Sequence, residues 1–448
     1  ETIIIDNFYC SDIEFKCYIQ FIIFYIKNDK DSLLVDFLIE RCSKHITLLN
    51  CLFWELHLNS RFGKSKEPDT YLGIKFKKYL AMGKGDIHIK LLNGELFVQL
   101  MENISDSCRN ENTGSRIAKN SNYEGVIKSF SIQKLNVLPI APTVTVDGIY
   151  FDQIRMKDSA TRPIILPFHT TNGKVYKVMY KNENVRSDQI VMNIINLAEI
   201  IIKKDLGIDL DLVTYNVLPT SDTGGLIEIV DDCDTIYDIE QCTKSTILNY
   251  ILDNNENMMV ISLREKFIKS TAAFCAITYL LGVGDRHLHN IMIKKDARLF
   301  HIDYGFILGK DTLFQNPTIR VTKSMIEAMG GENSKHYKKF TELCVKIYNC
   351  LRRNIDIFMH LLIFLSKISP EIGKTEEEIR EEIFKRFIPG EDDIEAELHI
   401  VEILQEDNHT AQLKDLIHYH TQEKTLSKCC DNLRSFVTNL WAYSNYTQ

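Results

Sequence analysis

The sequence contains few residues that interrupt secondary structure, since only 9 of its 448 residues are proline and 20 are glycine. This scarcity excludes a collagen-like repeat and argues against extended disorder. Apolar residues make up 45% and charged residues 25%, proportions that are typical of globular proteins. The length predicts two or three domains, each able to bury a core of its own.

Long hydrophobic runs and an excess of positive charge are also missing. The longest apolar runs, YIQFIIFYI (18–26) and IFMHLLIFLS (357–366), are shorter than the roughly 20 residues of a membrane-spanning helix. The formal net charge of −8 gives no general attraction to nucleic acid, so we expect no nucleic-acid partner. The 12 cysteines form no CxxC pair and no zinc-type spacing, which favours thiols in a reducing compartment.

Residues 1 to about 135 have the pattern of helices. Within 31–60, apolar residues recur at steps of three and four, which predicts amphipathic helix. The polar segment 102–125 predicts a loop beside a domain boundary. The chain begins at Glu1 without methionine or a signal-like segment, so we expect a longer natural chain.

Short strand-like runs follow from about residue 136. Two runs within 162–181 flank TTNGK, and Asn-Gly in such a turn is a strong hairpin signal. A helix is predicted over 187–204, followed by strands in TYNVLPT and GLIEIV. Beyond 245 the chain is mainly helical, apart from a second hairpin within 290–303. A small mixed lobe followed by a larger helical lobe is typical of a bilobal kinase.

The segment GVGDRHLHNIMI (282–293) places an acid, an imidazole and an amide within six residues. Asp285 and Asn290 have the spacing of Asp and Asn in the kinase pattern H-R-D-x-x-x-x-N, and Asp303 follows in LFHIDYG at a strand end. Phosphoryl transfer needs a group that receives or orients the proton of the attacking hydroxyl, and oxygen ligands for a metal. These residues supply both, although His287 follows the acid instead of preceding it.

Each of these residues alone is more typical of a turn, a cap or a structural position. Their order along the chain, together with Lys181, favours catalysis. We interpret His289 and His301 as structural histidines.

GDRHLHNIMI and LFHIDYGFILG together resemble the phosphoinositide 3-kinase family, whose catalytic loop is D-R-H-x-x-N and whose metal motif is H-I-D-F-G. Tyr304 replaces the Phe of that motif. Further segments are similar to the family's helical domain (FLIERC and LLNCLFWELHL), phosphate loop (MKDSATRP), lysine strand (YKVMYKNENVRSDQ) and hinge (GLIEIV). MIEAMGGENSKHYKKF resembles the class III, vacuolar-sorting branch, whereas the phosphate loop and hinge are closer to class I.

The resemblance implies a multidomain fold, in which an all-α helical-repeat (PIK) domain precedes a bilobal, protein-kinase-like α+β catalytic domain. We expect the helical domain and a linker at 1–135, the kinase N-lobe at 136–230, and the C-lobe with a C-terminal amphipathic helix at 231–448. The family's C2 domain is expected upstream of residue 1.

The resemblance also assigns an ATP site. Lys181 is expected to pair with the phosphates, and Lys177 is the other candidate on the same strand face. The segment between Lys181 and Asp188 is one residue shorter than the class III pattern, so the ion-pair partner of Lys181 stays open. The other expected contacts are Ser159 and Ala160 in the phosphate loop, Glu228 and Val230 in the hinge, and Met292 and Ile302 in the apolar floor.

Asn290 and Asp303 are expected to hold Mg²⁺, with Mn²⁺ as an alternative. Asp285 and His287 divide the base and orienting roles. An imidazole with a pKa near neutrality suits a weakly acidic inositol hydroxyl. Which of the two residues accepts the proton stays open.

The segment 304–323 is expected to contact the acceptor. A phosphorylated inositol head group needs clustered cations, because each phosphate carries about −1.5 to −2 charges. The segment offers only Lys310, Arg320 and Lys323, which favours plain phosphatidylinositol and its 3-hydroxyl. The alternatives are a class I-like kinase of phosphorylated phosphoinositides, a protein kinase of the related large-kinase group, and an inactive scaffold. The filled catalytic positions argue against the scaffold.

The resemblance implies a role in membrane trafficking or autophagy. It also implies a cytoplasmic enzyme held peripherally on endomembranes, with a regulatory protein subunit. In the C-terminal segment 425–448, apolar residues recur at steps of three and four and end at Leu440 and Trp441. The pattern alone favours a helix packed on the core, whereas the resemblance favours contact with the membrane.

Overall fold

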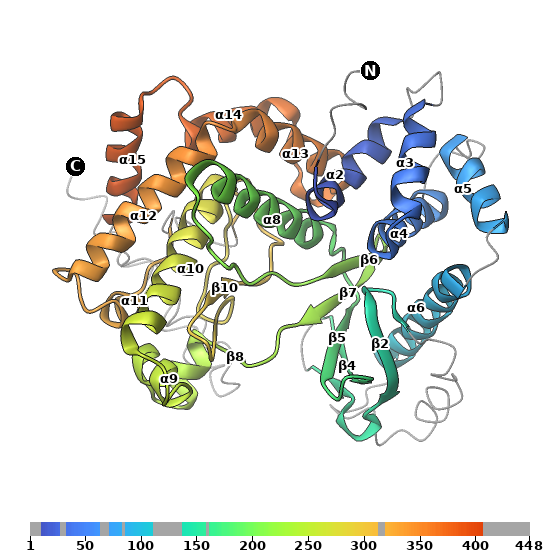
Figure 1. The fold of residues 1–448 in the computed structure, drawn as a ribbon, viewed down its shortest axis with the longest axis horizontal. Helices are drawn as coiled ribbons and strands as arrows, with labels where there is room; N and C mark the ends of the chain where they lie inside the picture. Colours follow the sequence, from blue (N-terminus) through green and yellow to red (C-terminus); the bar gives the residue numbers. More distant parts are fainter. Residues whose placement is uncertain are drawn as a thin grey trace, which may run out of the picture.

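The computed structural model describes residues 10–26, 33–62, 71–82, 86–110, 137–157, 161–311 and 319–405. They form a group of N-terminal helices, an antiparallel sheet and a C-terminal helical lobe (Figure 1). Ser159 and Ala160 of the expected phosphate loop lie outside the described residues, as do Leu440 and Trp441 of the C-terminal stripe.

The described N-terminal helices are α2 (Asp12–Tyr25), α3 (Leu33–Ser43), α4 (Ile46–Phe62), α5 (Tyr71–Met82) and α6 (Asp86–Asn110). The amphipathic pattern of 31–60 belongs to two of them, because α3 ends at Ser43 and α4 begins at Ile46. The Asp12 carboxylate of α2 lies 2.6 Å from Arg41, near the end of α3, and 2.9 Å from His45, within the break. The break is therefore held by a contact with another helix.

Within the described residues, the larger sheet has seven strands in the order β1-β2-β4-β5-β7-β6, with β3 paired to β4. All of these pairs are antiparallel. The predicted hairpin around TTNGK is confirmed as β4–β5, and Gly173 of its turn adopts the left-handed φ of 79° that glycine tolerates best. The strands are β1 (Val137–Leu138), β2 (Ala141–Ile149), β3 (Arg155–Met156), β4 (Ile164–Thr170), β5 (Val175–Lys181), β6 (Val217–Ser221) and β7 (Gly224–Ile229).

The helix predicted over 187–204 is α8 (Arg186–Leu206), which follows β5. It contacts β6, α2 and the C-terminal helices α12 (Lys335–Arg352) and α13 (Ile355–Ile368) (Figure 1). Its apolar residues are buried at the spacing of a helix face, and it ends at Gly207 in the left-handed conformation with φ 66°. α8 therefore links the sheet to the C-terminal lobe.

A second sheet of three strands, β8 (Cys233–Thr235), β9 (Ile291–Lys294) and β10 (Leu299–His301), begins the C-terminal lobe within the described residues. The antiparallel β9–β10 pair confirms the second predicted hairpin. The remaining helices are α9 (Ile247–Asp253), α10 (Val260–Leu280), α11 (Lys323–Ala328), α14 (Glu376–Phe387) and α15 (Asp393–Gln405). Short helical turns lie at η4 (Phe151–Gln153), η5 (Asp238–Cys242) and η6 (Pro370–Ile372).

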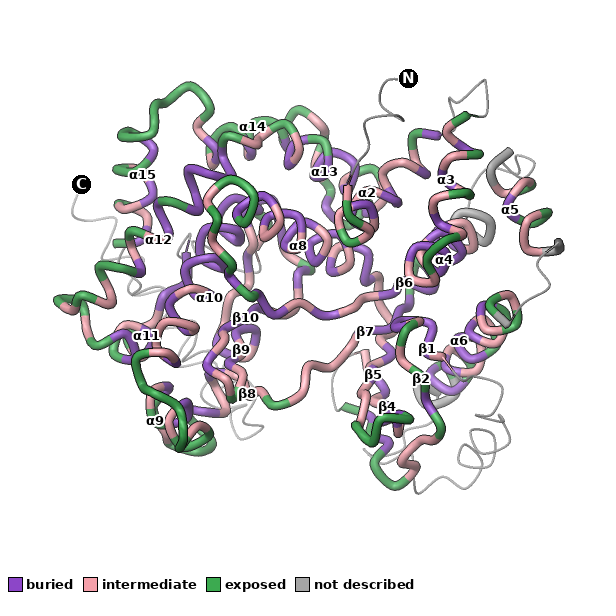
Figure 2. The backbone as a smooth tube through the Cα atoms, viewed as in Figure 1, coloured by how far each residue is buried: buried purple, intermediate pink, exposed green. Residues whose placement is uncertain are grey.

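The described residues bury two apolar cores. One core joins the N-terminal helices to the large sheet: Trp54 of α4 is 1% exposed, and Phe97 of α6 packs edge-to-face on Phe168 of β4 at 5.8 Å. The other core joins α8 to the C-terminal helices around α10, which is buried along most of its length (Figure 2). The sheet and α8 thus rest on different cores, with the predicted active site at their junction.

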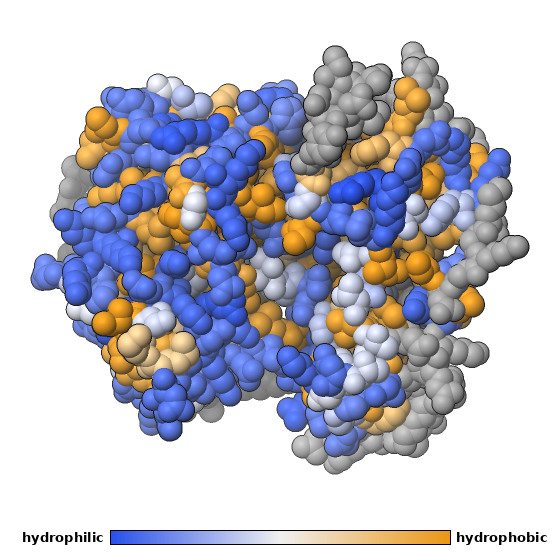
Figure 3. Space-filling view, in the orientation of Figure 1, coloured by the Kyte–Doolittle hydropathy of each residue, from blue (hydrophilic) through white to orange (hydrophobic). Residues whose placement is uncertain are grey.

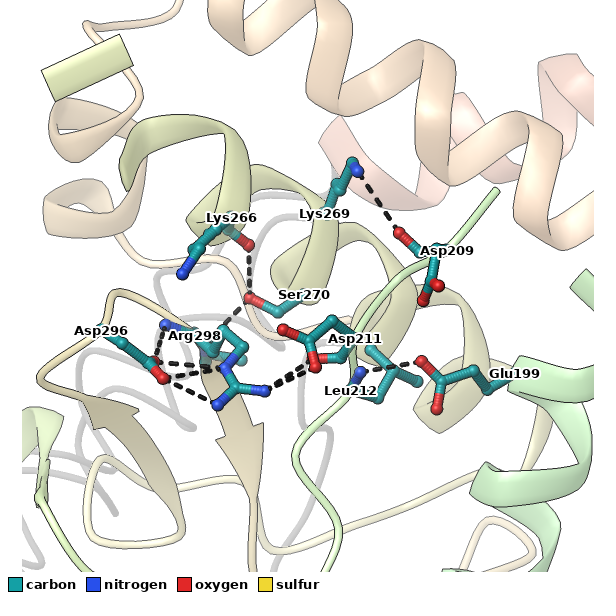
Figure 4. Close-up of polar contacts among 10 residues, drawn as sticks. Glu199, Asp209, Asp211, Leu212, Lys266, Lys269, Ser270, Asp296 and Arg298 are labelled. Carbon is teal, nitrogen blue, oxygen red and sulfur yellow. Dashed lines mark hydrogen bonds and ion pairs between the residues drawn. The ribbon is translucent and has the colours of Figure 1, made fainter. Parts of the chain in front are cut away.

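The loop 207–216, between α8 and β6, is tied to the C-terminal lobe by polar contacts (Figure 4). Arg298, in the turn between β9 and β10, donates a hydrogen bond of 2.8 Å to Asp211 Oδ1. Glu199 of α8 accepts a hydrogen bond of 2.9 Å from the amide of Leu212. The loop therefore connects α8 to the hairpin that leads into the metal motif.

The surface in Figure 3 is mainly hydrophilic over the C-terminal helices. Exposed apolar side chains gather at the start of α10, where Met258, Met259, Val260 and Ile261 are each more than a third exposed. Among the described residues, no helix combines the length and the apolar character needed to cross a bilayer.

Candidate active site

Lys181, the last residue of β5, has a side chain that is 14% exposed. Its Nζ lies 2.5 Å from Glu183 Oε1 and 3.7 Å from Asp303 Oδ2. Burial acts to lower the pKa of Lys181, but the carboxylates of Asp303, Asp188 and Glu183 outweigh it and raise that pKa. The lysine is therefore held charged beside the predicted metal ligand.

Lys177 faces the same side of β5 as Lys181, because side chains four residues apart share a strand face. Its Nζ lies 2.6 Å from Asp231 Oδ1, at the exit of the hinge, and its side chain is 40% exposed. The geometry therefore favours Lys181 over Lys177 as the lysine of the predicted phosphate site.

The catalytic loop begins where 281–284 pack backbone to backbone against 306–310. The Gly284 amide donates to the Phe306 carbonyl at 2.9 Å, and the Gly309 amide donates to the Gly282 carbonyl at 2.9 Å. A Cβ atom at position 284 would lie 2.2 Å from the carbonyl oxygen of Lys310. Only glycine fits at position 284, which explains the glycine directly before Asp285.

The structure brings together the acid, the imidazole and the amide of this loop. Asp285 has a left-handed φ of 53°, and its carbonyl accepts a hydrogen bond of 3.0 Å from Asn290 Nδ2. Nε2 of His287 lies 3.8 Å from Oδ2 of Asp285. Because the amide nitrogen of Asn290 is engaged by the loop, its amide oxygen is the atom suited to bind a cation.

Arg286, which was not singled out from the sequence, holds this loop to the metal motif. Its guanidinium donates to the carbonyls of Gly284 at 2.9 Å and Ile302 at 2.8 Å, and also to that of Asp303. It lies over the Tyr304 ring, 5.4 Å from the ring centroid. The only sequence signal for this role is its place inside Asp-Arg-His, because spacing cannot reveal contacts with distant carbonyls.

Asp303 lies two residues after the end of β10, with a left-handed φ of 63° and a side chain that is 47% exposed. Tyr304, which stands where the family has Phe, is 0% exposed. Its hydroxyl donates a hydrogen bond of 3.1 Å to the carbonyl of His301. The buried hydroxyl therefore has a partner, so Tyr can occupy this position.

Asp188 lies in the first turn of α8 and is 5% exposed. Its Oδ1 accepts a hydrogen bond of 3.2 Å from the Tyr304 amide. Burial and the nearby Asp303 carboxylate raise the pKa of Asp188 to about 6. Glu183 and Asp303 are thus the residues in ion-pair contact with Lys181, while Asp188 raises the pKa of the lysine through its charge.

The other two histidines of the motifs have structural surroundings. His301 is 3% exposed and stacks on Phe274 at 5.3 Å. Burial and the charge of Arg286 lower its pKa well below the usual value, so the ring stays neutral. His289 stacks on Tyr237 at 3.9 Å. These contacts agree with the interpretation of both residues as structural.

The expected hinge connects the two sheets. β7 ends at Ile229, and Val230 leads into β8. The Glu228 carboxylate accepts hydrogen bonds from the amide and the side-chain nitrogen of Asn216, at 2.9 and 2.7 Å. The side chains of Val230, Met292 and Ile302 are partly buried against the C-terminal core.

The three cations expected to face the acceptor have different surroundings. Lys310 donates a hydrogen bond of 2.5 Å to the carbonyl of Glu371. Arg320 is only 5% exposed, and the side chain of Lys323, on α11, is 87% exposed. Residues 312–318 between them lie outside the described part of the chain.

Comparison with known proteins identifies the region that holds the loop and the metal motif. Residues 237–367 match the family model of phosphatidylinositol 3- and 4-kinases. The chain contains a phosphatidylinositol 3- and 4-kinase domain. Asp285, His287, Asn290 and Asp303 all lie within the matched segment of this kinase domain.

Individual relatives extend the similarity beyond the kinase domain. Phosphatidylinositol 3-kinase pik3 of Schizosaccharomyces pombe is 29% identical over 367 residues, which cover 78% of this chain and 45% of the relative. Phosphatidylinositol 3-kinase VPS34 of Arabidopsis thaliana is 28% identical over 436 residues, 92% of this chain and 53% of the relative. VPS34 of Saccharomyces cerevisiae is 35% identical over 230 residues, 50% of this chain and 26% of the relative.

These matches confirm the resemblance to phosphoinositide 3-kinases, and the relatives named VPS34 agree with a class III-like chain. The kinase-like α+β character of the catalytic region is confirmed as well. The chain spans about half the length, or less, of the curated relatives that it matches.

Proposed function

We propose that this chain is the catalytic part of a phosphatidylinositol 3-kinase, which transfers the γ-phosphate of ATP to the 3-hydroxyl of phosphatidylinositol. The observation that carries the proposal is that Lys181, Asn290 and Asp303, which come from three separate segments, lie close together. Lys181 Nζ lies 3.7 Å from Asp303 Oδ2, and the Ile302 amide next to Asp303 donates to the Asn290 carbonyl at 3.0 Å. The kinase-domain match and the names of the relatives support the same activity.

ATP would lie between the large sheet and the catalytic loop. Lys181 provides a compact charge for the phosphates, and the backbone of Glu228 and Val230 would contact adenine. Met292 and Ile302 supply an apolar floor. In the nucleotide-bound state, the phosphates would compete with Glu183 for Lys181, because both are anionic.

A divalent cation fits the donors that the chain provides. Among the described residues, no group of three or more His, Cys, Asp or Glu side chains could hold a metal by itself. Kinase Mg²⁺ does not need such a group, because one or two carboxylates and the substrate phosphates bind it. We expect Asn290 and Asp303 to hold Mg²⁺, or Mn²⁺ in its place. The ion would neutralise charge on the phosphoryl group during transfer.

We expect Asp285 and His287 to accept and orient the proton of the acceptor hydroxyl. The distance of 3.8 Å between His287 Nε2 and Asp285 Oδ2 allows one group to orient the other. Either the imidazole or the carboxylate can accept the proton, because both groups act as general bases in enzymes. Arg286 stabilises the loop by donating hydrogen bonds to the carbonyls of Gly284 and Ile302.

Plain phosphatidylinositol is the acceptor that the described cations favour. Lys310 is bonded to the Glu371 carbonyl and Arg320 is buried, so neither presents a fully exposed charge. Lys323 is exposed but has Glu327 at 3.8 Å. A head group with additional phosphates would gain little from this arrangement.

The domain boundaries, the cellular location and the protein partner are proposed by similarity to the same family. We propose that α2 to α6 belong to a PIK-type helical domain at 1–135, that the N-lobe covers 136–230, and that the C-lobe covers 231–448. The enzyme would act in the cytoplasm, at the surface of endomembranes during trafficking or autophagy, with a regulatory protein subunit.

Separate assays of three lipids test the substrate assignment. Vesicles that contain phosphatidylinositol, its 4-phosphate or its 4,5-bisphosphate are incubated with the chain, labelled ATP and Mg²⁺, and the products are separated by thin-layer chromatography. The proposal expects a 3-phosphorylated product from phosphatidylinositol alone. Equal rates on the bisphosphate would indicate a class I-like kinase instead, and phosphorylation of protein substrates without any lipid product would indicate a protein kinase.

A further inference from the structure

A cavity of about 290 Å³ lies behind the expected ATP site, where the N-terminal helices meet the large sheet and α8. Its walls come from α2, α4, β2, β5, α8, β6 and β7. Tyr176 lines it, whereas Lys177 and Lys181 do not. Because side chains alternate along a strand, the cavity lies on the face of β5 opposite the lysines. The phosphoryl-transfer proposal makes no use of it.

The lining is polar, and its charged side chains already have hydrogen-bond partners. Its carboxylates are already engaged: Glu55 accepts from Gln20 at 2.7 Å, and Glu228 accepts from Asn216 at 2.7 Å. Lys16, the one cation in the lining, lies 3.4 Å from the side-chain oxygen of Asn216. An added anion would face two carboxylates against one lysine, and an added cation would have to compete for carboxylates that are already engaged, so either charge is unfavourable in this buried site. The lining therefore favours an uncharged ligand with hydrogen-bonding groups.

Three lining residues have a buried polar atom without a hydrogen-bond partner among the described residues, namely the Tyr176 hydroxyl and two others. One is the indole Nε1 of Trp54, a donor on a side chain that is only 1% exposed. The other is the amide oxygen Oε1 of Gln189, an acceptor on α8. Buried polar groups in proteins almost always have a partner, so an unpaired donor and acceptor beside one cavity point to a missing molecule.

We propose that this cavity binds a small, uncharged molecule that presents an acceptor to Trp54 and a donor to Gln189. Cyclic amides and pyrimidine bases carry both groups side by side on a planar ring. Amide side chains from Asn193 and Asn196 of α8 also line the cavity and can add further hydrogen bonds. The volume lies at the lower end of the range for ligand pockets, which suits a single ring and excludes a nucleotide.

The position of the cavity couples it to the kinase site. Gln189 directly follows Asp188, which is hydrogen-bonded to the amide of Tyr304 in the metal motif. Glu228, whose carboxylate faces the cavity, lies in the expected hinge. A ligand that fixes Gln189 and the wall near Glu228 would therefore alter the KM for ATP.

Trp54 provides a direct probe of binding, because the chain has only two tryptophans. The full chain labelled with 5-fluorotryptophan should give two ¹⁹F resonances, and Trp441→Phe identifies the Trp54 signal. Uracil is titrated without ATP or lipid, so the result does not depend on the kinase activity. We expect a saturable shift of the Trp54 resonance. The absence of any saturable shift would show that the cavity holds only water and would overturn the proposal.

N-methylation tests the predicted contact with Gln189. 1,3-Dimethyluracil keeps the carbonyl acceptors but has no N–H donor, so it should bind about five- to tenfold more weakly than uracil. In Gln189→Leu this preference should disappear, while Gln99→Leu, on α6 and bonded to Glu95 outside the cavity, should retain it. A preference that persists in a folded Gln189→Leu chain contradicts the assignment. If that variant does not fold, Gln189→Met, which is of similar size and has no strong acceptor, replaces it, and a preference that persists there contradicts the assignment.

The coupling is tested separately by the initial rate of ATP turnover with and without saturating uracil. We expect the KM for ATP to change by about twofold or more. An unchanged KM at saturation would overturn the coupling to α8 and the hinge, whereas the binding test above stands on its own.

Discussion

The backbone amide of Tyr304 donates a hydrogen bond of 3.2 Å to Oδ1 of Asp188. This contact joins the first turn of α8 to the metal motif, 116 residues further along the chain. Because α8 packs in the C-terminal core and the strand that carries Lys181 packs in the N-terminal core, Asp188 lies where the two halves meet. Its charge state therefore affects both folding and the kinase site.

Asp188→Asn should change how stability depends on pH. Burial raises the pKa of Asp188 from an ordinary value near 3.8 to about 6, so the folded chain binds this proton more tightly than the unfolded chain. The favourable contribution of protonated Asp188 is fully present below pH 3.8 and is lost as the pH rises through about 6. Asparagine keeps the acceptor for Tyr304 without titrating.

The unfolding free energy of the variant, relative to that of the parent chain, should therefore rise by about 1–3 kcal/mol from pH 4 to pH 7.5. Urea denaturation of both proteins at the two pH values measures this difference. A constant difference in unfolding free energy across the range would show that Asp188 does not titrate between them.

Asp303→Ala should nearly abolish lipid phosphorylation and leave the fold intact. Loss of one preorganised electrostatic group in an active site typically costs about 2.7–4 kcal/mol, or 10²–10³ in kcat. The side chain of Asp303 is 47% exposed and belongs to no core, so the melting temperature should change little. Asp253→Ala, an exposed aspartate on α9, is the matched control and should keep full activity. Near-normal activity of Asp303→Ala would refute the metal-ligand role.

Glu183→Gln should lower the KM for ATP about two- to fivefold. Glu183 lies 2.5 Å from Lys181 Nζ, where it competes with nucleotide phosphates for the same charge. Glutamine keeps the size of the side chain but removes the negative charge, and a partly exposed ion pair of this kind is worth about 1 kcal/mol or less. Initial rates at varied ATP concentration give KM and kcat separately, with exposed Glu256→Gln as the control. A large fall in kcat at unchanged KM would show instead that Glu183 positions Lys181 for transfer.

Local sequence signals predicted the parts of the fold that local chemistry determines. Asn-Gly in TTNGK located the β4–β5 hairpin, and the motif spacing located Asp285, Asn290 and Asp303 around one site. The break between α3 and α4 was not predictable in this way. The apolar period continues across it, and the contacts that hold it come from Asp12 of another helix.

The same limit applies to the candidate site. The ion-pair partner of Lys181 stayed open in the sequence, because the approach of Asp188 and Asp303 depends on how the two lobes meet, although Glu183 is only two residues away. Arg286 acts through carbonyls of residues 302 and 303, which no side-chain pattern encodes. Contacts with the backbone of a distant segment are set by tertiary packing, and they require the structure.

Added positive charge near the acceptor should widen substrate choice. Residues 310–319 contain one cation, Lys310, whose amine is bonded to the Glu371 carbonyl. Asn316→Lys with Thr318→Lys should raise the rate on the 4,5-bisphosphate relative to phosphatidylinositol, because each added lysine can pair with a head-group phosphate. The ratio of the two rates on matched vesicles is the measurement.

A control separates this effect from general attraction to anionic vesicles. Gln241→Lys with Asn257→Lys adds the same charge at exposed positions outside the acceptor segment. This control should leave the ratio of the two rates unchanged. An equal rise in the control would attribute the effect to net charge and not to the acceptor segment.

The C-terminal segment allows the most direct test of membrane contact. Residues 425–448 lie outside the described part of the chain, so the prediction depends on sequence alone. Leu433, Phe436, Leu440 and Trp441 recur at helical spacing, and an amphipathic helix of this kind can lie about 5–10 Å deep in the head-group boundary. Such a contact would bring the active site to a substrate that remains in the bilayer.

Deletion of 432–448 should therefore abolish phosphorylation of vesicle lipid and preserve or raise ATP hydrolysis in solution. The reason is that Lys181, Asn290 and Asp303 remain in place, whereas access to the bilayer is lost. Lipid phosphorylation, vesicle flotation and the melting temperature are measured on the same preparation. A folded truncated chain that phosphorylates vesicle lipid at the full rate would contradict the membrane role. Loss of both activities together with the fold would show that the stripe packs on the kinase core, because a surface contact with lipid does not stabilise the protein in solution.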